Sequence, residues 1–251
     1  MKYLIAANWK MYKTNEETKN YFEEFLPLVK DLSNIDIMVA PPFTSLFTAS
    51  KALTEESPVS LGAQNMFYAE KGAYTGEVSP LMLKELNVKY VIIGHSERRQ
   101  IFKEDNSLIN KKVFSAVENE LRPILCVGET LEEREQGITL KVVETQIRKG
   151  LAGLDADIKY IDIAYEPVWA IGTGKTATPE QAEEVHQFIR SLINEISKGN
   201  DTETRILYGG SVKPENAKDL IKQPNINGFL VGSASLDPQK FYQIIQNSLE
   251  G

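Results

Sequence analysis

The chain has 251 residues, and its 42% hydrophobic and 9% aromatic content is typical of a globular protein with a large core. Its formal net charge of −7 argues against a nucleic acid or an anionic membrane as the partner. The single cysteine, Cys126, excludes an internal disulfide and a thiolate metal site. No apolar stretch suits a signal peptide or a membrane span, so we expect one soluble, cytoplasmic domain over residues 1–251.

Short apolar runs alternate with longer amphipathic stretches along the whole chain. The runs show little polar alternation, which is typical of parallel strands covered on both faces. In chain order the predicted strands are Tyr3–Asn8, Asp36–Ala40, Val59–Ala63, Tyr90–Gly94, Pro123–Val127, Ile161–Tyr165, Arg205–Tyr208 and Gly228–Val231. Eight strands in this length give units of about 31 residues, which is the length of a strand with its crossover helix.

Helix-start signals follow most of the predicted strands. Thr14, Thr130 and Thr178 each stand three residues before Glu or Gln, which is the spacing of a capping box. Proline occupies four predicted first helical positions: Pro80, Pro179, Pro214 and Pro238. An open doubly wound sheet would show the same alternation, but the count of eight favours an α/β fold of the closed (β/α)8 type.

Polar residues and glycines gather where the predicted strands end, and in a barrel these ends share one rim. They are Asn8-Trp9-Lys10, His95-Ser96-Glu97, Glu166, Gly209-Gly210-Ser211 and Gly232-Ser233. Glu166 follows an apolar run, so burial should raise its pKa and its basicity. The glycines leave backbone N–H groups free to approach a phosphate. Each residue alone fits a structural role, but their convergence on one rim indicates a site.

Several lookalike motifs fail on detail. Gly172–Thr176 ends like a nucleotide-binding P-loop, but Trp169 stands where that motif needs glycine. The same glycines lack the strand–turn–helix context of a dinucleotide fingerprint. Gly94–Arg98 lacks the final glycine of a nucleophile elbow. The two histidines, His95 and His186, have no carboxylate cluster around them, so we expect no metal site.

Five longer motifs run from one end of the chain to the other: Ala7–Met11, Gly72–Glu77, Ile93–Arg99, Ala164–Gly174 and Tyr208–Val212. In these motifs and their order the chain resembles the triosephosphate isomerase family. The resemblance implies a (β/α)8 TIM barrel that interconverts dihydroxyacetone phosphate and D-glyceraldehyde 3-phosphate through an enediolate, in glycolysis and gluconeogenesis. Its substrate is a small phosphorylated triose, and no cofactor is implied.

The resemblance also assigns roles at matching positions. Glu166 would be the base that moves a proton between C1 and C2. His95 would polarise the carbonyl, kept neutral by the start of the helix that follows it. Lys10 would supply a cation near the negative charge of the substrate, and Asn8 would help to position that cation. Glu97 would lie beside this cluster. The other substrate-binding residues implied are Trp9, Gly172, Ser211, Leu230, Gly232 and Ser233.

A lid and a homodimer are implied as well. Residues Pro167–Thr176 would close over the substrate. The long loop Met66–Glu77 carries four large apolar residues, which is typical of an interface. By resemblance, Thr75 would reach the neighbouring active site, and Glu77 would pair with Arg98 of the partner subunit.

The chain departs from the family pattern at three positions. Ser233 stands where the family usually has glycine, so the freedom of a glycine backbone is lost there. Asn225 and Asn227 stand where it commonly has aspartate. An ion pair expected there, with Arg190, would weaken to a neutral hydrogen bond.

Two rival functions remain open at this point. Another phosphate-binding barrel enzyme, such as an aldolase, would need a Schiff-base lysine or a metal, whereas the sixth strand offers Glu166. A catalytically inactive binding barrel is expected to have lost Lys10, His95 or Glu166, and all three are present.

Overall fold

Eight parallel strands close into a barrel, in which each strand pairs with the next and the last pairs with the first. The computed structural model describes residues 1–170, 176–199 and 203–251. The strands are β1 (Leu4–Asn8), β2 (Asp36–Ala40), β3 (Val59–Ala63), β4 (Val88–Ile93), β5 (Arg122–Val127), β6 (Asp162–Tyr165), β7 (Ile206–Tyr208) and β8 (Gly228–Val231). Closure confirms the barrel over the open sheet, and no strand end differs from its predicted bound by more than two residues.

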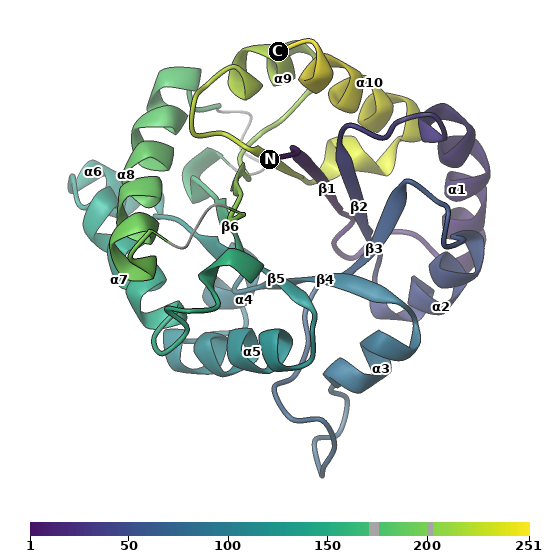
Figure 1. The fold of residues 1–251 in the computed structure, drawn as a ribbon, viewed down its shortest axis with the longest axis horizontal. Coiled ribbons are helices and arrows are strands. Elements are labelled where there is room, and N and C mark those ends of the chain that lie inside the picture. The colour runs from purple at the N-terminus through teal and green to yellow at the C-terminus, as the bar shows by residue number, and fades with distance from the viewer. Residues whose placement is uncertain (171–175, 200–202) are drawn as a thin grey trace.

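Helices surround the barrel on all sides (Figure 1). They are α1 (Asn15–Val29), α2 (Phe43–Ala52), α3 (Pro80–Glu85), α4 (Ser96–Gln100), α5 (Asn106–Glu118), α6 (Leu131–Glu135), α7 (Thr139–Gly150), α8 (Pro179–Ser197), α9 (Pro214–Ile221) and α10 (Pro238–Leu249). The described residues also form the short 3₁₀ turns η1 (Ile158–Tyr160), η2 (Val168–Ala170) and η3 (Ser233–Leu236). In the part of the chain that the structure describes, no helix is both long and apolar enough to span a membrane.

The predicted helix starts are confirmed. Thr14, Thr130 and Thr178 all form complete capping boxes, in which the threonine oxygen accepts a backbone N–H and the Glu or Gln side chain accepts one in return. All four prolines stand in the first turn of a helix: Pro80, Pro179, Pro214 and Pro238. These local signals fix where each crossover begins, and therefore where each strand delivers its last residue.

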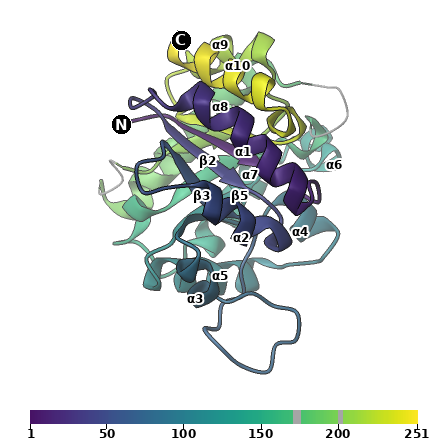
Figure 2. The same cartoon turned by 90° about the vertical axis from the view of Figure 1, so that its right-hand side faces the viewer.

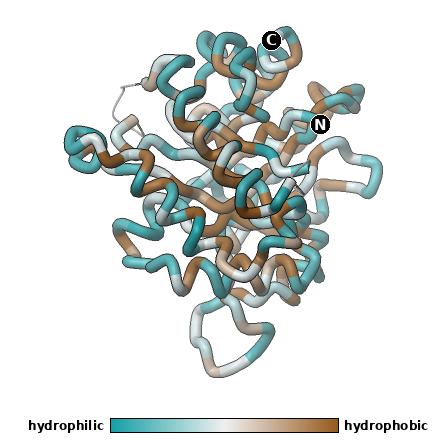
Figure 3. The backbone as a smooth tube through the Cα atoms, turned by 60° about the vertical axis from the view of Figure 1, so that its left-hand side comes forward, coloured by the Kyte–Doolittle hydropathy of each residue, from teal (hydrophilic) through white to brown (hydrophobic). Residues whose placement is uncertain are grey.

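Alternation along the strands divides the apolar side chains into two cores. Residues pointing inward, such as Met38, Ile92 and Leu207, fill the barrel itself. Their neighbours pointing outward, such as Val39, Ile93 and Ile206, pack against the helices. Figure 3 shows the hydrophobic stretches in the middle of the molecule and the hydrophilic ones around its outside.

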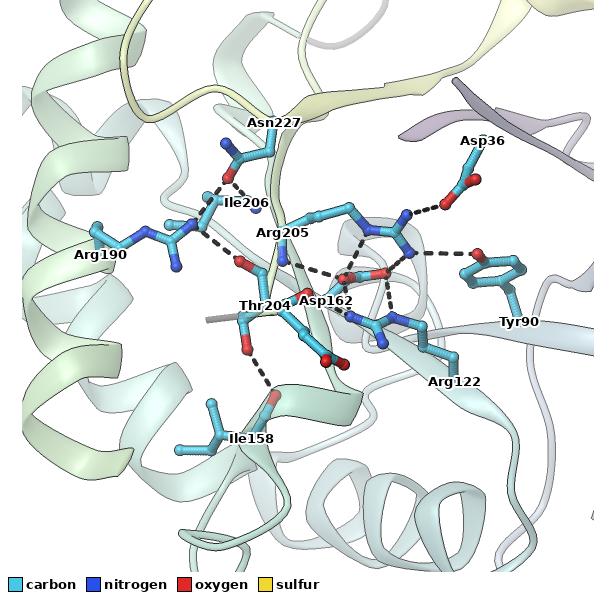
Figure 4. Close-up of polar contacts among 11 residues, drawn as sticks. Asp36, Tyr90, Arg122, Ile158, Asp162, Arg190, Thr204, Arg205, Ile206 and Asn227 are labelled. Atoms are coloured by element: carbon cyan, nitrogen blue, oxygen red, sulfur yellow. Dashed lines mark hydrogen bonds and ion pairs between the residues drawn. The ribbon is translucent and has the colours of Figure 1, made fainter. Parts of the chain in front are cut away.

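A network of buried charges closes the barrel at the strand starts (Figure 4). The Asp162 carboxylate, fully buried, accepts hydrogen bonds from the guanidinium groups of Arg122 at 2.8 Å and Arg205 at 2.7 Å. Arg205 also reaches Asp36 at 2.6 Å and Tyr90 at 3.3 Å. Burial opposes the charged form of Asp162, but the two arginines outweigh it and hold its pKa below the usual value.

The loop between β3 and α3 projects far from the barrel (Figures 1 and 2). The rings of Phe67, Tyr68 and Tyr74 cluster on it, with centroids 4.3 and 4.4 Å from that of Phe67. Tyr74 is 43% exposed, as expected of an interface residue. Met66 is not exposed: it is buried in the outer core, so the sequence interpretation was wrong for this residue.

Candidate active site

An open pocket of about 880 Å³ lies at the rim where the strands end. Its lining brings together nearly all the predicted site residues: Asn8, Trp9, Lys10, His95, Glu97, Glu166, Ser211, Leu230, Gly232 and Ser233. Gly172 lies outside the described residues, as do residues 171–175 of the predicted lid as a whole. Parallel strands place their last residues at one end of a barrel, so positions scattered over the chain meet in one cavity.

Lys10 follows β1 in a left-handed backbone conformation, with φ of 52°. Its N–H donates to the Asn8 side-chain oxygen at 3.0 Å, and its carbonyl accepts from the Gln64 amide at 2.8 Å. The ammonium group pairs with Glu97 at 2.7 Å. A lysine pays a conformational penalty for positive φ, and these contacts on both sides of the residue hold it there.

His95 is the N-cap of the short helix α4. Its Nδ1 accepts the backbone N–H of Glu97 at 3.2 Å, and its Nε2 lies 2.8 Å from the Glu166 carboxylate. An accepted bond at Nδ1 places the ring proton on Nε2, where it is donated to Glu166. Burial lowers the pKa of His95, but the facing Glu166 charge outweighs burial and raises it above the usual value. The bond accepted at Nδ1 is that of a neutral ring, whereas the facing Glu166 charge favours the protonated one.

Glu166 is 2% exposed and stands directly after β6. One carboxylate oxygen faces His95, and the other accepts the N–H of Ser96 at 2.9 Å. Burial raises the pKa of Glu166, as the sequence predicted, but the bonds from His95 and Ser96 outweigh burial and leave the pKa below its usual value. The sequence prediction of a raised pKa is therefore wrong in this structure, because it could not include these donors.

The glycines after β7 have a steric role that the sequence did not reveal. A side chain at Gly209 would come within 2.9 Å of the Glu166 side chain, and one at Gly210 would collide with the Tyr208 hydroxyl. Ser211 follows them at the pocket wall. Gly232 and Ser233 also line the pocket, where the chain passes from β8 into η3.

Trp9 and the three predicted interface residues lie in different surroundings. The Trp9 indole is fully buried and packs edge-on against Tyr21, with centroids 4.7 Å apart, so it borders the pocket from the core side. Thr75 and Glu77 are exposed on the projecting loop. Arg98 pairs within its own chain, donating to Glu104 at 2.6 Å.

Sequence reasoning missed several residues that support the site. Gln64 directly follows β3, at the same rim position as the residues that were singled out, so its place after a strand was an available signal. Arg99 donates to the carbonyls of Gly94 and Cys126, and Glu129 accepts from the Trp169 indole at 2.9 Å. Their roles depend on contacts between distant segments, for which the sequence gives no local signal.

The two asparagines that depart from the family pattern have clear partners. The Asn227 oxygen accepts from Arg190 at 2.8 Å, so a neutral amide takes the place of the carboxylate, as predicted. The Asn225 amide donates to Glu183 at 2.6 Å. An aspartate at position 225 would face that carboxylate with a like charge, so the amide suits this neighbour.

Comparisons with known proteins agree with this geometry. The family model described as Triosephosphate isomerase matches residues 3–248. Triosephosphate isomerases of Aquifex aeolicus and Dictyoglomus turgidum are 56% and 55% identical to the chain over 245 and 246 residues. The alignments cover 98% and 97% of this chain, and 99% and 98% of the two relatives. The Carboxydothermus hydrogenoformans enzyme is 55% identical, with 98% of both chains covered.

Among the residues that the structure describes, no group of three or more His, Cys, Asp or Glu side chains is arranged to hold a metal ion. The pocket instead gathers a carboxylate, an imidazole and an ammonium beside two glycine-containing turns. Together with the match over nearly the whole sequence, this arrangement shows that the chain belongs to the triosephosphate isomerase family.

Proposed function

We propose that the chain interconverts dihydroxyacetone phosphate and D-glyceraldehyde 3-phosphate by proton transfer through an enediolate. The observation that carries this proposal is the direct contact of the His95 imidazole with the Glu166 carboxylate in a pocket that also holds Lys10. Moving a proton next to a carbonyl requires a base, a hydrogen-bond donor for the oxygen and a cation for the developing charge. These three side chains supply one of each.

Substrate binding would change the partners of Glu166. A substrate carbonyl oxygen that accepts the Nε2–H of His95 would replace the Glu166 carboxylate as its partner. Glu166 would then lose one of the bonds that lower its pKa, and burial would raise that pKa toward a value suited to a base. The substrate would therefore activate the base by occupying its hydrogen-bond donor.

The phosphate fits the turns after β7 and β8. Backbone N–H groups of Ser211, Gly232 and Ser233 would bind it, with Leu230 lining the floor. Lys10, held by Asn8 and paired with Glu97, would lie between the phosphate and the reacting carbons. Serine at position 233 still offers its backbone N–H, so this set of phosphate-binding N–H groups does not depend on a glycine there.

We also propose a homodimer that works in the cytoplasm. The aromatic cluster on the projecting loop is an apolar surface that a second copy would cover, and Thr75 and Glu77 stand exposed beside it. Because Arg98 already pairs with Glu104, Glu77 from a second copy would join an existing ion pair. The free, buried thiol of Cys126 suits a reducing compartment.

A coupled assay with glyceraldehyde 3-phosphate tests the proposed activity most simply. The purified protein is assayed with EDTA present and without any added cofactor for the isomerisation step. We expect dihydroxyacetone phosphate to form well above the uncatalysed rate. Formation at the background rate would overturn the proposal, and it would favour the inactive binding barrel. Cleavage or condensation products in place of the isomer would favour an aldolase.

A further inference from the structure

Gln146, in the middle of α7, makes two hydrogen bonds to the backbone of one residue. Its side-chain oxygen accepts the N–H of Gly128 at 2.7 Å, and its side-chain nitrogen donates to the carbonyl of the same glycine at 3.1 Å. A primary amide is the side-chain group that satisfies a backbone donor and acceptor at once. Gly128 directly follows β5, where the chain leaves the barrel.

The backbone on either side of Gly128 is bonded to the segment that carries the base. The carbonyl of Val127 accepts the N–H of Glu166 at 2.7 Å, and the carbonyl of Glu129 accepts the N–H of Val168 at 3.1 Å. Gly128 itself lies so close to Glu166 that any side chain there would collide with the Glu166 carbonyl. The peptide groups of Gly128 thus point to Gln146, while its neighbours hold Glu166 and Val168.

Glu129 extends the same support to the residues after the base. Its fully buried carboxylate accepts from the Tyr165 hydroxyl at 3.1 Å and from the Trp169 indole at 2.9 Å. Both side chains flank Glu166 in the sequence. A shift of the Gly128–Glu129 backbone would therefore move the residues before and after Glu166 together.

We propose that Gln146 is a positioning residue for the general base: its amide fixes Gly128, and through it the backbone of Glu166. This inference rests on the proposed isomerase function. Gln146 touches neither the pocket nor Glu166 itself, and its distance from the chemistry explains why no motif revealed it. Displacing a catalytic group by about 1 Å costs up to roughly 100-fold in rate, so a modest shift would be measurable.

Two substitutions separate this role from simple packing. Gln146→Glu keeps the shape and the acceptor, but at neutral pH it faces the Gly128 carbonyl without a proton to donate. Protonation at lower pH restores the donor. Gln146→Met removes both bonds at all pH values. Gln136→Glu is the matched control, because Gln136 is exposed and its side chain donates to exposed Glu132 at 3.3 Å.

We expect kcat of Gln146→Glu at about pH 8 to be roughly 10-fold below wild type, with KM changed by less than about 2-fold. The ratio of mutant to wild-type kcat should rise as the pH is lowered into the range where the introduced carboxyl takes up its proton, because the protonated carboxyl donates again. Gln146→Met should lose as much activity and show no recovery, and the control should match wild type. A kcat ratio that does not change with pH, or a fully active Gln146→Met, would overturn the proposal.

Backbone hydrogen exchange provides a readout that does not depend on activity. Gln146→Met should speed exchange in peptides covering residues 127–130 and 165–169, whereas Gln136→Glu should not. If exchange in those peptides were the same in Gln146→Met as in wild type, the positioning role would be contradicted, whether or not the wild-type protein is an active isomerase. If the wild-type protein had no isomerase activity but Gln146→Met still exchanged faster in these peptides, the role of Gln146 in fixing the Glu166 backbone would be supported. Only the proposed function would then be rejected.

Discussion

The two ends of the barrel bury charged side chains in different ways. At the strand starts, the Asp162 carboxylate is surrounded by the permanent charges of Arg122 and Arg205 (Figure 4). At the strand ends, Glu166 is almost equally buried, but its partners are one imidazole N–H and the backbone N–H of Ser96. Both carboxylates have a pKa below the usual value, because hydrogen-bond donors outweigh burial.

The difference lies in whether the partners can be replaced. Asp162 is fully buried and, like Arg122 and Arg205, does not line the pocket, so that network serves to close the barrel. The imidazole that holds Glu166 borders an open pocket, and a substrate oxygen can take its proton donor. A buried carboxylate held by hydrogen-bond donors therefore stabilises the fold at the strand starts, and at the strand ends it provides a base. Substitutions at the two ends should separate activity from stability.

Glu166→Gln should give the largest effect, and on activity alone. The amide keeps the shape but cannot accept a proton, so kcat should fall by about 10²–10⁴-fold. Affinity for inorganic phosphate as a competitive inhibitor should stay nearly the same, because the phosphate cradle is untouched. Steady-state kinetics with phosphate inhibition measures both. A variant that keeps half of its kcat would remove Glu166 from the role of base.

Asp162→Asn should give the largest loss of stability and leave chemistry intact. Buried Arg205 would keep only Asp36 as its counter-charge, and partly exposed Arg122 would lose its bidentate partner, which should lower the free energy of unfolding by about 3 kcal/mol. Urea unfolding measures the loss, and kcat per folded molecule should match wild type. Glu144→Gln, which breaks the exposed pair with Arg148, serves as the control and should change stability little. A large fall in kcat for folded Asp162→Asn would break the proposed separation of the two ends.

His186 should make stability depend on pH. Burial lowers its pKa to about 4, because the ring is enclosed by protein; the hydrogen bond to the Asn225 carbonyl acts in the opposite direction but is outweighed. The unfolded chain therefore binds a proton that the folded chain does not, so stability is complete above about pH 6.5 and falls as the pH drops toward 4. The loss should reach about 3 kcal/mol.

Urea unfolding at a series of pH values measures this dependence. His186→Gln keeps a donor for the Asn225 carbonyl but has no titrating group, so its stability should fall less steeply over the same range. Equal slopes for the two proteins would show that His186 is not the group responsible.

Asn227→Asp should give the smallest effect, a gain in stability of about 1 kcal/mol or less. The carboxylate can still accept from Arg190 and from the N–H of Ile206, and it adds a charge opposite the guanidinium. Thermal unfolding at low and high salt checks the gain, which should shrink as salt screens the pair. Activity should not change, because this contact belongs to the strand starts. Lower stability at low salt would contradict the interpretation.

The sequence predicted one end of the barrel far better than the other. Asn8, His95 and Glu166 could be singled out because polar residues directly after apolar strands share one rim whatever the detailed packing. Asp36 and Arg205 form an ion pair across 169 residues of sequence, and nothing local distinguishes them from surface charges. Such a pair exists only once the barrel closes.

The ionisation of the site was also beyond the sequence. Burial of Glu166 could be inferred from the apolar run before it, and burial alone raises a carboxyl pKa. The donors that reverse this shift, His95 and Ser96, lie far away along the chain, Ser96 by 70 residues. Gln146 shows the same limit, because its two bonds to Gly128 join a helix face to a strand end.

The central claim, proton transfer by Glu166 through an enediolate, is tested most directly by isomerisation in deuterium oxide. A proton held by the Glu166 carboxyl group can exchange with solvent before it returns to carbon. Starting from dihydroxyacetone phosphate, we expect the wild-type protein to form glyceraldehyde 3-phosphate that carries deuterium at C2. Glu166→Gln should form almost no labelled product. NMR or mass spectrometry measures the label. Rapid turnover that leaves the carbon-bound hydrogen entirely unexchanged would indicate direct hydride transfer and contradict this account.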